Sequence, residues 1–446
     1  MLIIYAVFFY ICQKPARMKR VLSVVCLLLI AISAYSQTGT WSGKVEVQGK
    51  SLTAVFHLDD SGCTFDSPDQ GAKGITALAS LTELGKLVIK IPSIGATYEG
   101  LWLGDRIIGS LIQRGVSFPL TLTPGEPELN RPQTPVGPFP YSCEEVSFTN
   151  GDAVLKGTLV LPEGCSRRTP VVIMVTGSGL QNRDEELFEH KPFAVIADAL
   201  ARNGIASLRY DDRGFGESTG DLVFCTIKDF KEDALAGIGL LRERFDRVGV
   251  IGHSEGGTIA LMIAAEGKAD FVVSLAGAVI SGKELLLWQN RTMLPASGFD
   301  AESVTAYCKL LEEAFDAIIA GEQVPSAGNS NLPEALVQNY QVTVAQLRSP
   351  YLKSFLKLDA SKSLGLISCP VLALNGTKDT QVDCESNLGS LRSGLSPAVP
   401  ARVEAVEGVN HLFQHCQTGA SSEYRNIEET FAPEVLDIIV NWIKAF

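Results

Sequence analysis

The fold of this chain is decided by the stretch Arg247-Val248-Gly249-Val250-Ile251-Gly252-His253-Ser254-Glu255-Gly256, which leads into the small-residue run Gly257-Thr258-Ile259-Ala260-Leu261. An apolar run, a G-x-S-x-G pentapeptide and a helical pattern predict a strand, a tight turn that carries a serine, and a helix. So sharp a turn strains the serine backbone, and glycines flank it because a Cβ there would collide with the neighbouring strand or helix. We therefore expect the hydroxyl of Ser254 to project at the end of a sheet.

A second G-x-S-x-G pentapeptide occurs at Gly216-Glu217-Ser218-Thr219-Gly220. With 41 glycines in 446 residues, the bare pattern is weak evidence by itself. This copy follows the polar loop Asp211-Asp212-Arg213, with no strand directly before it and no helix opening on it. The context therefore favours Ser254 over Ser218 as the nucleophile.

Length and composition predict two or three domains with proper cores, since the chain has 446 residues, of which 46% are hydrophobic and 20% charged. The first 36 residues resemble a targeting segment, with a basic start at Met18-Lys19-Arg20, an apolar stretch from Val21 to Ile32 and a cleavage site ending at Ser36. We expect Met18 to be the true start, and the mature chain to be periplasmic or extracellular. A start at Met1 would leave two short apolar segments and a membrane anchor as the alternative. Both segments are shorter than the roughly 20 residues that a spanning helix needs, so no stable membrane span is expected in the mature chain.

The charge of the chain argues against nucleic acid as a partner. The net charge is −12, and residues 1–36 hold four basic and no acidic residues, so their removal would lower it to −16. Such a surface repels phosphate backbones and anionic membranes. Eight cysteines follow residue 36, an even number that permits disulfides in an oxidising compartment. Their spacing shows neither a pairing nor a metal site, and buried free thiols explain them equally well.

The domain organisation follows from changes of pattern along the chain. Residues 37–123 read as short strands separated by turns, which predicts a small all-β sandwich or barrel. The proline-rich stretch 124–140 reads as an extended linker. In residues 141–446, buried strands alternate with helices after an initial hairpin, which predicts a mostly parallel sheet with helices on both faces. A helical insertion at about 280–365 interrupts the alternation and is expected to form a cap over the site.

A serine nucleophile needs a histidine base and an acid that orients it. In hydrolases of this strand-turn-helix type the order along the chain is serine, acid, histidine, which leaves His411 and His415 as the bases. His411 is favoured because it lies in the short loop Glu407-Gly408-Val409-Asn410-His411-Leu412, at the carboxyl end of the last apolar run. Asp379 is the favoured acid because it ends the loop after the run Val371 to Asn375, and Asp383 is its alternative.

The negative oxygen of a tetrahedral intermediate needs backbone N–H donors. We expect one donor from Glu255, directly after the nucleophile, and the other from Ser178 in the glycine turn Thr176-Gly177-Ser178-Gly179. A phosphate-binding loop is the alternative reading of this turn, but it lacks the lysine and the spacing of that motif.

Taken together, these motifs resemble those of the α/β-hydrolase superfamily, and within it the secreted bacterial EstD-like carboxylesterases. The resemblance covers residues 141–446 and implies an α/β-hydrolase fold and a carboxylic ester hydrolase that needs no metal or organic cofactor. Thr176 departs from the pattern, since many relatives have histidine there. The motifs that carry the resemblance are Gly177-Ser178-Gly179 with Arg183-Asp184, Asp212-Arg213-Gly214-Phe215-Gly216-Glu217-Ser218, Gly252-His253-Ser254-Glu255-Gly256, Asp379 and His411.

The sequence thus predicts an exported serine esterase that forms an acyl-enzyme on a small-molecule or acylated carbohydrate ester. One alternative is a peptidase of the serine aminopeptidase type, which would need acidic side chains in the cap, and Glu312, Glu313 and Asp316 are available for this role. An alternative of another class is a glycan-binding surface protein with a vestigial hydrolase domain. In either hydrolase reading, Arg213 and Asp184 are expected to brace loops rather than to touch substrate.

Overall fold

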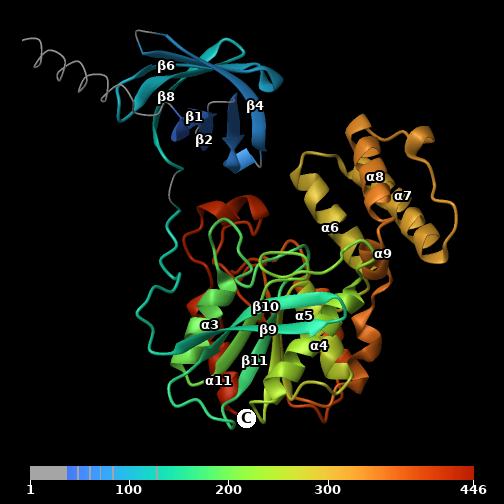
Figure 1. Ribbon diagram of the computed structural model, residues 1–446. Coiled ribbons are helices and arrows are strands. Elements are labelled where there is room, and N and C mark those ends of the chain that lie inside the picture. The colour runs from blue at the N-terminus through green and yellow to red at the C-terminus, as the bar shows by residue number, and fades with distance from the viewer. Residues whose placement is uncertain (1–37, 48–49, 60–61, 71, 83–84, 127–128) are drawn as a thin grey trace, which may run out of the picture. The chain divides into compact units, whose positions relative to one another are not determined.

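The computed structural model describes residues 38–446 apart from 48–49, 60–61, 71, 83–84 and 127–128 (Figure 1). Two units of structure follow one another along the chain, and the division falls between Glu128 and Leu129. The predicted targeting segment and its cleavage site lie outside the described residues, so export remains a prediction.

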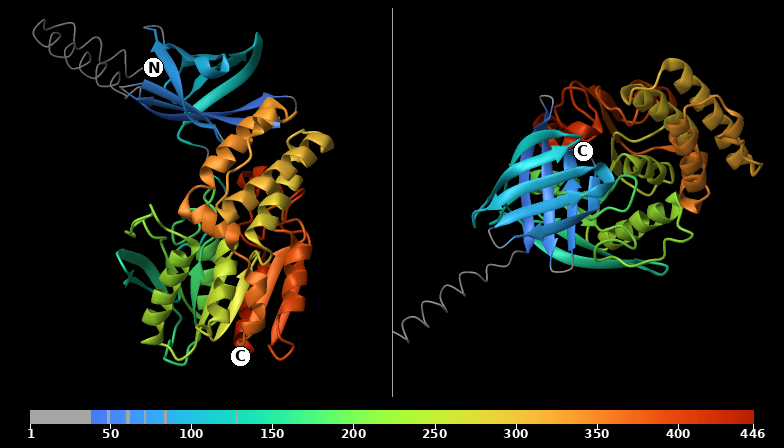
Figure 2. Two further views of the ribbon diagram at one scale, coloured as in Figure 1. Left: turned by 90° about the vertical axis from the view of Figure 1, so that its right-hand side faces the viewer. Right: turned by 90° about the horizontal axis from the view of Figure 1, so that it is seen from above.

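Eight antiparallel strands of the first unit close into a barrel, because β1 pairs with β8 as well as with β2 (Figure 2). Every second side chain points inward, as in β5, where Leu87, Ile89 and Ile91 are buried. The sequence predicts strands at 44–47, 52–58, 86–91, 97–101, 106–112 and 116–122, and none at β3 or β4. Most side chains of β4 are small or exposed, so no apolar alternation marks it. The elements are β1 (Gly39–Val47), β2 (Lys50–Asp59), β3 (Gly62–Ser67), η1 (Pro68–Gln70), β4 (Ala72–Leu81), β5 (Lys86–Ile91), η2 (Pro92–Ile94), β6 (Ala96–Trp102), β7 (Ile107–Gln113) and β8 (Val116–Pro124).

The later part of the proline-rich stretch is bound to the second unit. The guanidinium of Arg131 donates to the carbonyl oxygens of Phe188 and Ile427, at 2.9 and 2.8 Å. The side-chain amide of Gln133 donates to the carbonyl oxygen of Phe431 at 2.7 Å. This part of the predicted linker is therefore fixed to the surface that follows it in the chain.

The second unit is built on an eight-stranded sheet in the order β16-β15-β14-β13-β11-β12-β10-β9. Strands β11 to β16 are parallel, and the hairpin of β9 and β10 adds an antiparallel edge. This arrangement confirms the predicted mostly parallel sheet, and it brings the carboxyl ends of six strands to one edge. The strands are β9 (Ser142–Asn150), β10 (Ala153–Leu161), β11 (Val171–Val175), β12 (Ala206–Tyr210), β13 (Val248–His253), β14 (Phe271–Leu275), β15 (Val371–Gly376) and β16 (Ala401–Val406).

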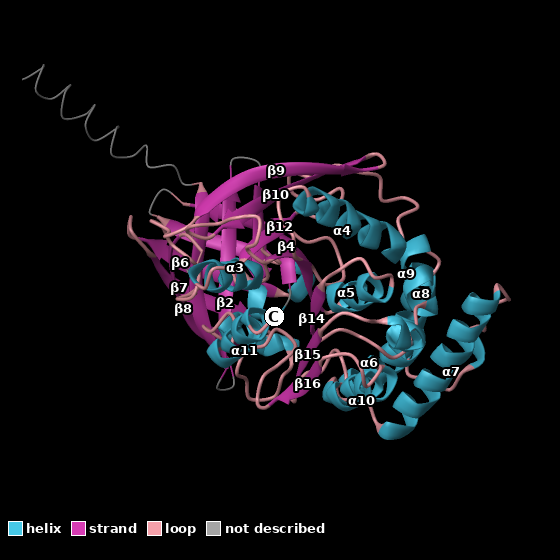
Figure 3. Cartoon of the chain, turned by 90° about the horizontal axis from the view of Figure 1, so that it is seen from below, coloured by secondary structure: helices cyan, strands magenta, loops and turns pink. Residues whose placement is uncertain are grey.

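Helices cover both faces of this sheet, as Figure 3 shows. All five residues of β11 are buried because successive side chains serve opposite faces. Val171, Ile173 and Val175 pack with α4, α5 and α10, whereas Val172 and Met174 pack with α3 and α11. The helices are α3 (Pro192–Arg202), α4 (Ile227–Arg242), α5 (Glu255–Ala265), α10 (Cys384–Gly394) and α11 (Pro433–Lys444), and a short η5 (Ser421–Asn426) precedes α11.

The segment between β14 and β15 is helical and has a core of its own. Tyr307, Leu311 and Phe315 of α7 are fully buried there, against Leu287 of α6 and Leu336 of α8. We call this segment, residues 280–366, the cap. Its elements are α6 (Gly282–Ala296), α7 (Ala301–Ala320), η3 (Ala327–Asn329), α8 (Glu334–Gln346), α9 (Pro350–Lys357) and η4 (Ala360–Leu366).

In the described part of the chain, none of the helices is both long enough and apolar enough to cross a bilayer. Within the same residues, His, Cys, Asp and Glu side chains form no group of three that could hold a metal ion. The eight cysteines located there are free thiols.

Candidate active site

Ser254 stands between the end of β13 and the start of α5, in the predicted strand-turn-helix arrangement. Its φ of 53° lies in the left-handed region, which is rare for a residue with a side chain. The flanking glycines permit this turn: a Cβ at Gly252 would collide with the carbonyl oxygen of Gly256, and a Cβ at Gly256 with that of Val175. The backbone of Ser254 is thus held in a strained conformation that its neighbours enforce.

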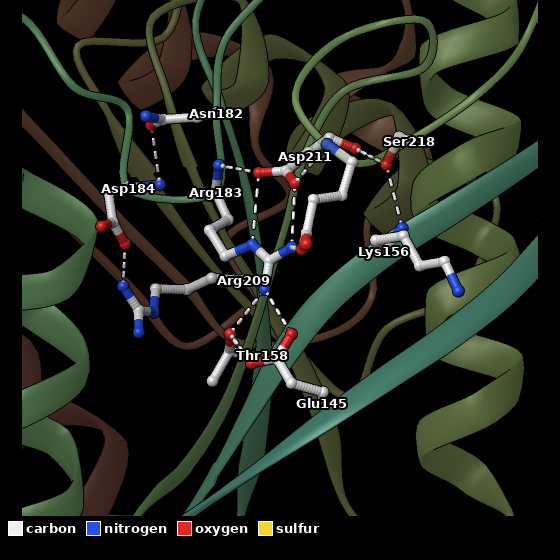
Figure 4. A network of polar contacts seen from close by, with 10 residues as sticks. Glu145, Lys156, Thr158, Asn182, Arg183, Asp184, Arg209, Asp211 and Ser218 are labelled. Atoms are coloured by element: carbon white, nitrogen blue, oxygen red, sulfur yellow. Dashed lines mark hydrogen bonds and ion pairs between the residues drawn. The ribbon is translucent and has the colours of Figure 1, made fainter.

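Ser218, in the second pentapeptide, has a structural role. Its side chain is buried, and Oγ donates to the carbonyl oxygen of Asp211 at 2.7 Å while it accepts from the N–H of Lys156 at 2.9 Å (Figure 4). The hydroxyl therefore joins a loop to β10.

Asp379 and His411 are directly bonded. His411 Nδ1 lies 2.7 Å from Asp379 Oδ2, and both side chains are buried. The other carboxylate oxygen of Asp379 accepts from the N–H groups of Gln381 and Val382, at 2.7 and 2.9 Å, which fixes its orientation. Each residue stands in a loop after a parallel strand, Asp379 after β15 and His411 after β16. The pair has the arrangement in which a carboxylate orients an imidazole and stabilises its charged form.

The alternatives for acid and base have other partners. Asp383 caps α10 by accepting from the N–H of Ser386 at 3.0 Å. His415 is half-exposed, and its ring nitrogens lie 2.9 Å from carboxylate oxygens of Glu429 and Glu434. Neither Asp383 nor His415 is hydrogen-bonded to the side chain of Asp379 or His411.

The link between Ser254 and His411 runs through the residue before the serine. The ring of His253 lies 4.8 Å from that of His411, between centroids, and its Nε2 is 2.9 Å from the carbonyl oxygen of His411. In the described part of the chain, the hydrogen bonds of the pair run from Asp379 to His411 and do not extend to Ser254 Oγ.

Ser178, Ser254 and Glu255 line one cavity of about 350 Å³. The structure therefore brings the two predicted oxyanion donors and the predicted nucleophile to the same space. The rest of the lining comes mainly from the cap, with smaller parts from the loops after β14 and β15: Ala278, Leu285, Leu286, Gln289, Tyr351, Leu352, Phe355, Gln381 and Val382, together with Gly179.

Two buried carboxyl groups near the serine turn have raised pKa values, those of Glu255, which lines this cavity, and Asp212. Burial raises the pKa of Glu255 to about 7, although a hydrogen bond of 2.7 Å from the Tyr351 hydroxyl opposes the rise. Burial also raises the pKa of Asp212 to about 8, against the bonds that it accepts from the N–H of Gln181 and the hydroxyl of Thr176. The Thr176 side chain, at the position that departs from the family pattern, thus serves as a donor to Asp212.

Arg183 fastens the loop that contains Ser178. Its guanidinium contacts Asp211 Oδ2 at 2.9 Å, Glu145 Oε2 at 2.6 Å and Thr158 Oγ1 at 2.8 Å (Figure 4). The three partners come from the loop after β12 and from β9 and β10. A planar guanidinium with five donors suits such a junction.

The two residues predicted to brace loops are in ion pairs, as expected. Asp184 bonds Arg209 of β12 (Figure 4), and Arg213 bonds Asp233 of α4 through a buried pair at 2.6 Å. Sequence reasoning missed three other residues near the site: His253, Glu185 and Tyr351. His253 is part of the G-x-S-x-G motif, but nothing in the sequence indicated which residues its ring contacts.

Comparison with known proteins identifies the family. Residues 189–411, half of the chain, match the protein family described as Serine aminopeptidase, S33. Over 140 residues, the chain is 41% identical to Esterase EstD of Thermotoga maritima. The aligned region makes up 31% of this chain and 33% of the relative. The chain thus matches about a third of the length of that curated relative.

Solved structures with similar coordinates include an esterase of Pyrococcus furiosus, with 18% identity, a TM-score of 0.41, and coverage of 69% of this chain and 93% of that one. They also include the proline iminopeptidase of Mycobacterium smegmatis, with 16% identity, a TM-score of 0.44, and coverage of 68% and 98%. The family match and the parallel sheet with its serine turn show that the chain belongs to the serine aminopeptidase S33 family of α/β hydrolases, in agreement with the predicted resemblance.

Proposed function

We propose that the chain is a serine carboxylic ester hydrolase that acts on small-molecule esters through an acyl-enzyme. The observation that carries the proposal is that Ser178, Ser254 and Glu255 line the same cavity. In the same unit, the side chains of Asp379 and His411 are hydrogen-bonded at 2.7 Å. The 41% identity to Esterase EstD over 140 residues supports an ester as the substrate.

In the proposed reaction, Ser254 Oγ attacks the ester carbonyl carbon while His411 Nε2 takes the hydroxyl proton. The N–H groups of Glu255 and Ser178 donate to the oxygen that becomes negative. His411 then protonates the departing alcohol, which leaves an acyl group on Ser254. Water attacks the acyl-enzyme with His411 as base, the acid is released, and the hydroxyl of Ser254 is restored.

The lining of the cavity favours an apolar acyl group. Leu285 and Leu286 of α6, Leu352 and Phe355 of α9, and Val382 surround it. A lining of this kind gains free energy by excluding water from hydrocarbon and offers few partners to a charged group. Simple esters and acylated carbohydrates with apolar acyl groups both meet this requirement.

The same lining argues against an aminopeptidase. An enzyme that binds a free amino group needs an acidic side chain directed at it, and the cap residues at the cavity are apolar or neutral. Of the three acidic residues expected for this role, Glu312 and Asp316 instead bond Lys283, at 3.3 and 2.7 Å, and Glu313 is exposed. Glu255 is the one acidic residue of the described lining, and the Tyr351 hydroxyl bonds it.

A glycan-binding protein with a vestigial hydrolase domain is the alternative of another class. Loss of function normally removes a member of the catalytic set, and this chain keeps Ser254, Asp379 and His411. Ion pairs, such as those of Arg183 with Asp211 and Arg213 with Asp233, also hold the surrounding loops. We therefore prefer an active enzyme.

Paired rates on a short-chain nitrophenyl ester and on an aminoacyl nitroanilide test the proposal. The ester should be hydrolysed with the larger kcat/KM, and a fluorophosphonate should label Ser254 stoichiometrically and stop the reaction. A larger kcat/KM on the anilide would show that the chain is a peptidase and would contradict the proposal. Absence of both activities together with absence of labelling would support the vestigial alternative.

We also propose that the chain is exported, on the basis of the apolar stretch from Val21 to Ile32 and the small residues that end at Ser36. Expression in a bacterial host should give a mature protein that begins at Gln37. An unprocessed N-terminus on cell-associated protein would contradict export by this route.

A further inference from the structure

His253 lies inside the serine turn, and its imidazole is bonded at both nitrogens. Nδ1 is 2.9 Å from Glu185 Oε1, and Nε2 is 2.9 Å from the carbonyl oxygen of His411. A carbonyl oxygen only accepts hydrogen bonds, so Nε2 must have a hydrogen, and the carboxylate of Glu185 requires one on Nδ1. An imidazole with hydrogens on both nitrogens is positively charged. His253 and Glu185 therefore form a buried ion pair.

The surroundings of His253 agree with this charge. Burial lowers its pKa, but the charge and hydrogen bond of Glu185, the bond to the His411 carbonyl and the charge of Asp379 together raise the pKa above its usual value. Two aromatic rings also lie near the imidazole, those of His411 and Phe413, at 4.8 and 6.4 Å between centroids. Both ring nitrogens of His253 and Oε1 of Glu185 have hydrogen-bond partners, which a buried ion pair requires.

Glu185 connects the pair to the loop of Ser178. The oxygen that faces His253, Oε1, also accepts from the N–H of Gly177 at 2.6 Å, and Gly177 directly precedes Ser178. Glu185 itself has a φ of 52°, a left-handed conformation that persists only where the surroundings enforce it. One carboxylate oxygen thus joins the loop of the predicted oxyanion donor to the serine turn.

We propose that His253 and Glu185 are positioning residues, which hold the loop of His411 and the loop of Ser178 at a fixed separation on either side of Ser254. The inference rests on the proposed ester hydrolysis, because it assigns the two loops their roles as base and oxyanion donor. Neither His253 nor Glu185 lines the cavity that Ser254 faces. The pair acts through the carbonyl oxygen of His411 and the N–H of Gly177, and a shift of about 1 Å in such groups can lower the rate about 100-fold.

His190 provides a matched control, because it is also a buried histidine bonded at both nitrogens. Its partners are neutral: Nδ1 lies 2.9 Å from Thr430 Oγ1, and Nε2 lies 3.0 Å from the carbonyl oxygen of Tyr424 and 3.1 Å from the side-chain nitrogen of Gln414. Burial is the main cause that lowers its pKa to about 4, so it stays uncharged at neutral pH. Its replacement costs packing and hydrogen bonds without removing an ion pair from the site.

The test compares Glu185→Gln, Glu185→Asp and His190→Gln with the wild type on a nitrophenyl ester. Glu185→Gln keeps the shape of the side chain but removes its charge, so the pKa of His253 should fall, and its ring should lose one of its two hydrogens as the pH rises. In this variant we expect kcat to decrease about 10- to 100-fold with KM within about twofold, and the deficit to widen between pH 6 and 9. Glu185→Asp keeps the charge but shortens the reach of the carboxylate, so kcat should decrease with the pH profile unchanged.

The readouts separate positioning from folding. His190→Gln should lower the melting temperature and leave both the pH profile and the kcat of the folded fraction unchanged. A wild-type kcat and pH profile in Glu185→Gln would overturn the inference, and if that variant does not fold, full kcat in Glu185→Asp would do so. The proposed function is tested separately by Ser254→Ala: turnover in that variant would overturn ester hydrolysis by Ser254, whatever the Glu185 variants show.

Discussion

Tyr351 donates a hydrogen bond of 2.7 Å to Glu255 Oε2, and this bond ties helix α9 of the cap to the residue that follows the nucleophile. The cap and the predicted oxyanion donor are therefore mechanically connected. The carboxyl group involved is buried, and its pKa is raised from 4.5 to about 7. Protonation of the Glu255 carboxyl group therefore affects both the stability of the fold and the contact between the cap and α5.

The first prediction is that Glu255 makes the protein less stable as the pH rises. Between about pH 4.5 and 7 the unfolded chain has an ionised Glu255 while the folded chain keeps the proton, so raising the pH favours unfolding. The full effect is on the order of 3 kcal/mol, since each pKa unit corresponds to about 1.4 kcal/mol. The free energy of unfolding in urea, measured from pH 4 to 8, gives the dependence.

The control for this prediction is Glu255→Gln, which keeps an acceptor for Tyr351 and cannot ionise. The difference in stability between the two proteins should change across the interval, with the wild type becoming less stable relative to the variant as the pH rises. The comparison must be made between variants because Asp212 and His190 titrate in the same range. A difference that is constant from pH 4 to 8 would show that Glu255 has no raised pKa.

The second prediction separates the two serines of the G-x-S-x-G pentapeptides. Ser254→Ala should lower kcat about 10⁴- to 10⁶-fold, because the nucleophile is lost. Ser218→Ala should leave kcat nearly unchanged. It should nevertheless lower the free energy of unfolding by about 1 to 3 kcal/mol, because the N–H of Lys156 loses its acceptor. Steady-state kinetics and denaturant titration measure the two effects, and equal losses of kcat would mean that the turn at Ser254 has no special role.

The positions that could be predicted from sequence are those at the ends of strands. Ser254, Asp379 and His411 each follow an apolar run, and parallel strands bring such ends to one edge, where the structure places all three after β13, β15 and β16. Their catalytic roles stay a prediction. The loop of Ser178 was found in the same way. The serine turn, the Asp379–His411 bond and the shared cavity therefore lie where the local patterns indicated.

The residues that could not be predicted depend on contacts between distant segments. Glu185 reaches His253 across 68 positions and Tyr351 reaches Glu255 across 96, and no periodicity encodes such pairs. Strand β4 was missed for a different reason. Its side chains are mostly small or exposed, so its place in the barrel is determined by the pairing of its backbone with β3 and β5.

The third prediction distinguishes the two aspartates after β15. Asp379→Asn should lower kcat about 10⁴-fold, because the amide no longer holds the imidazole of His411 in the required tautomer. Asp383→Asn should leave kcat unchanged, since Asn caps a helix about as well as Asp. The two substitutions are chemically identical and four residues apart, so kcat on one ester, together with melting temperatures, compares them directly. A larger loss in Asp383→Asn would reverse the assignment of the acid.

The last prediction concerns the length of the acyl group. Phe355 of α9 lines the cavity with Leu285 and Leu286, so Phe355→Ala should lengthen the space available to an acyl chain. The best substrate in a series of nitrophenyl esters should shift to a longer chain, because each added methylene that is buried contributes about 0.8 kcal/mol, or about fourfold in kcat/KM. Met293→Ala is the control, since Met293 is an exposed side chain of the same cap and should leave the preference unchanged. An unchanged chain-length optimum in Phe355→Ala would place the acyl group elsewhere, and the cavity would then hold the alcohol part of the ester.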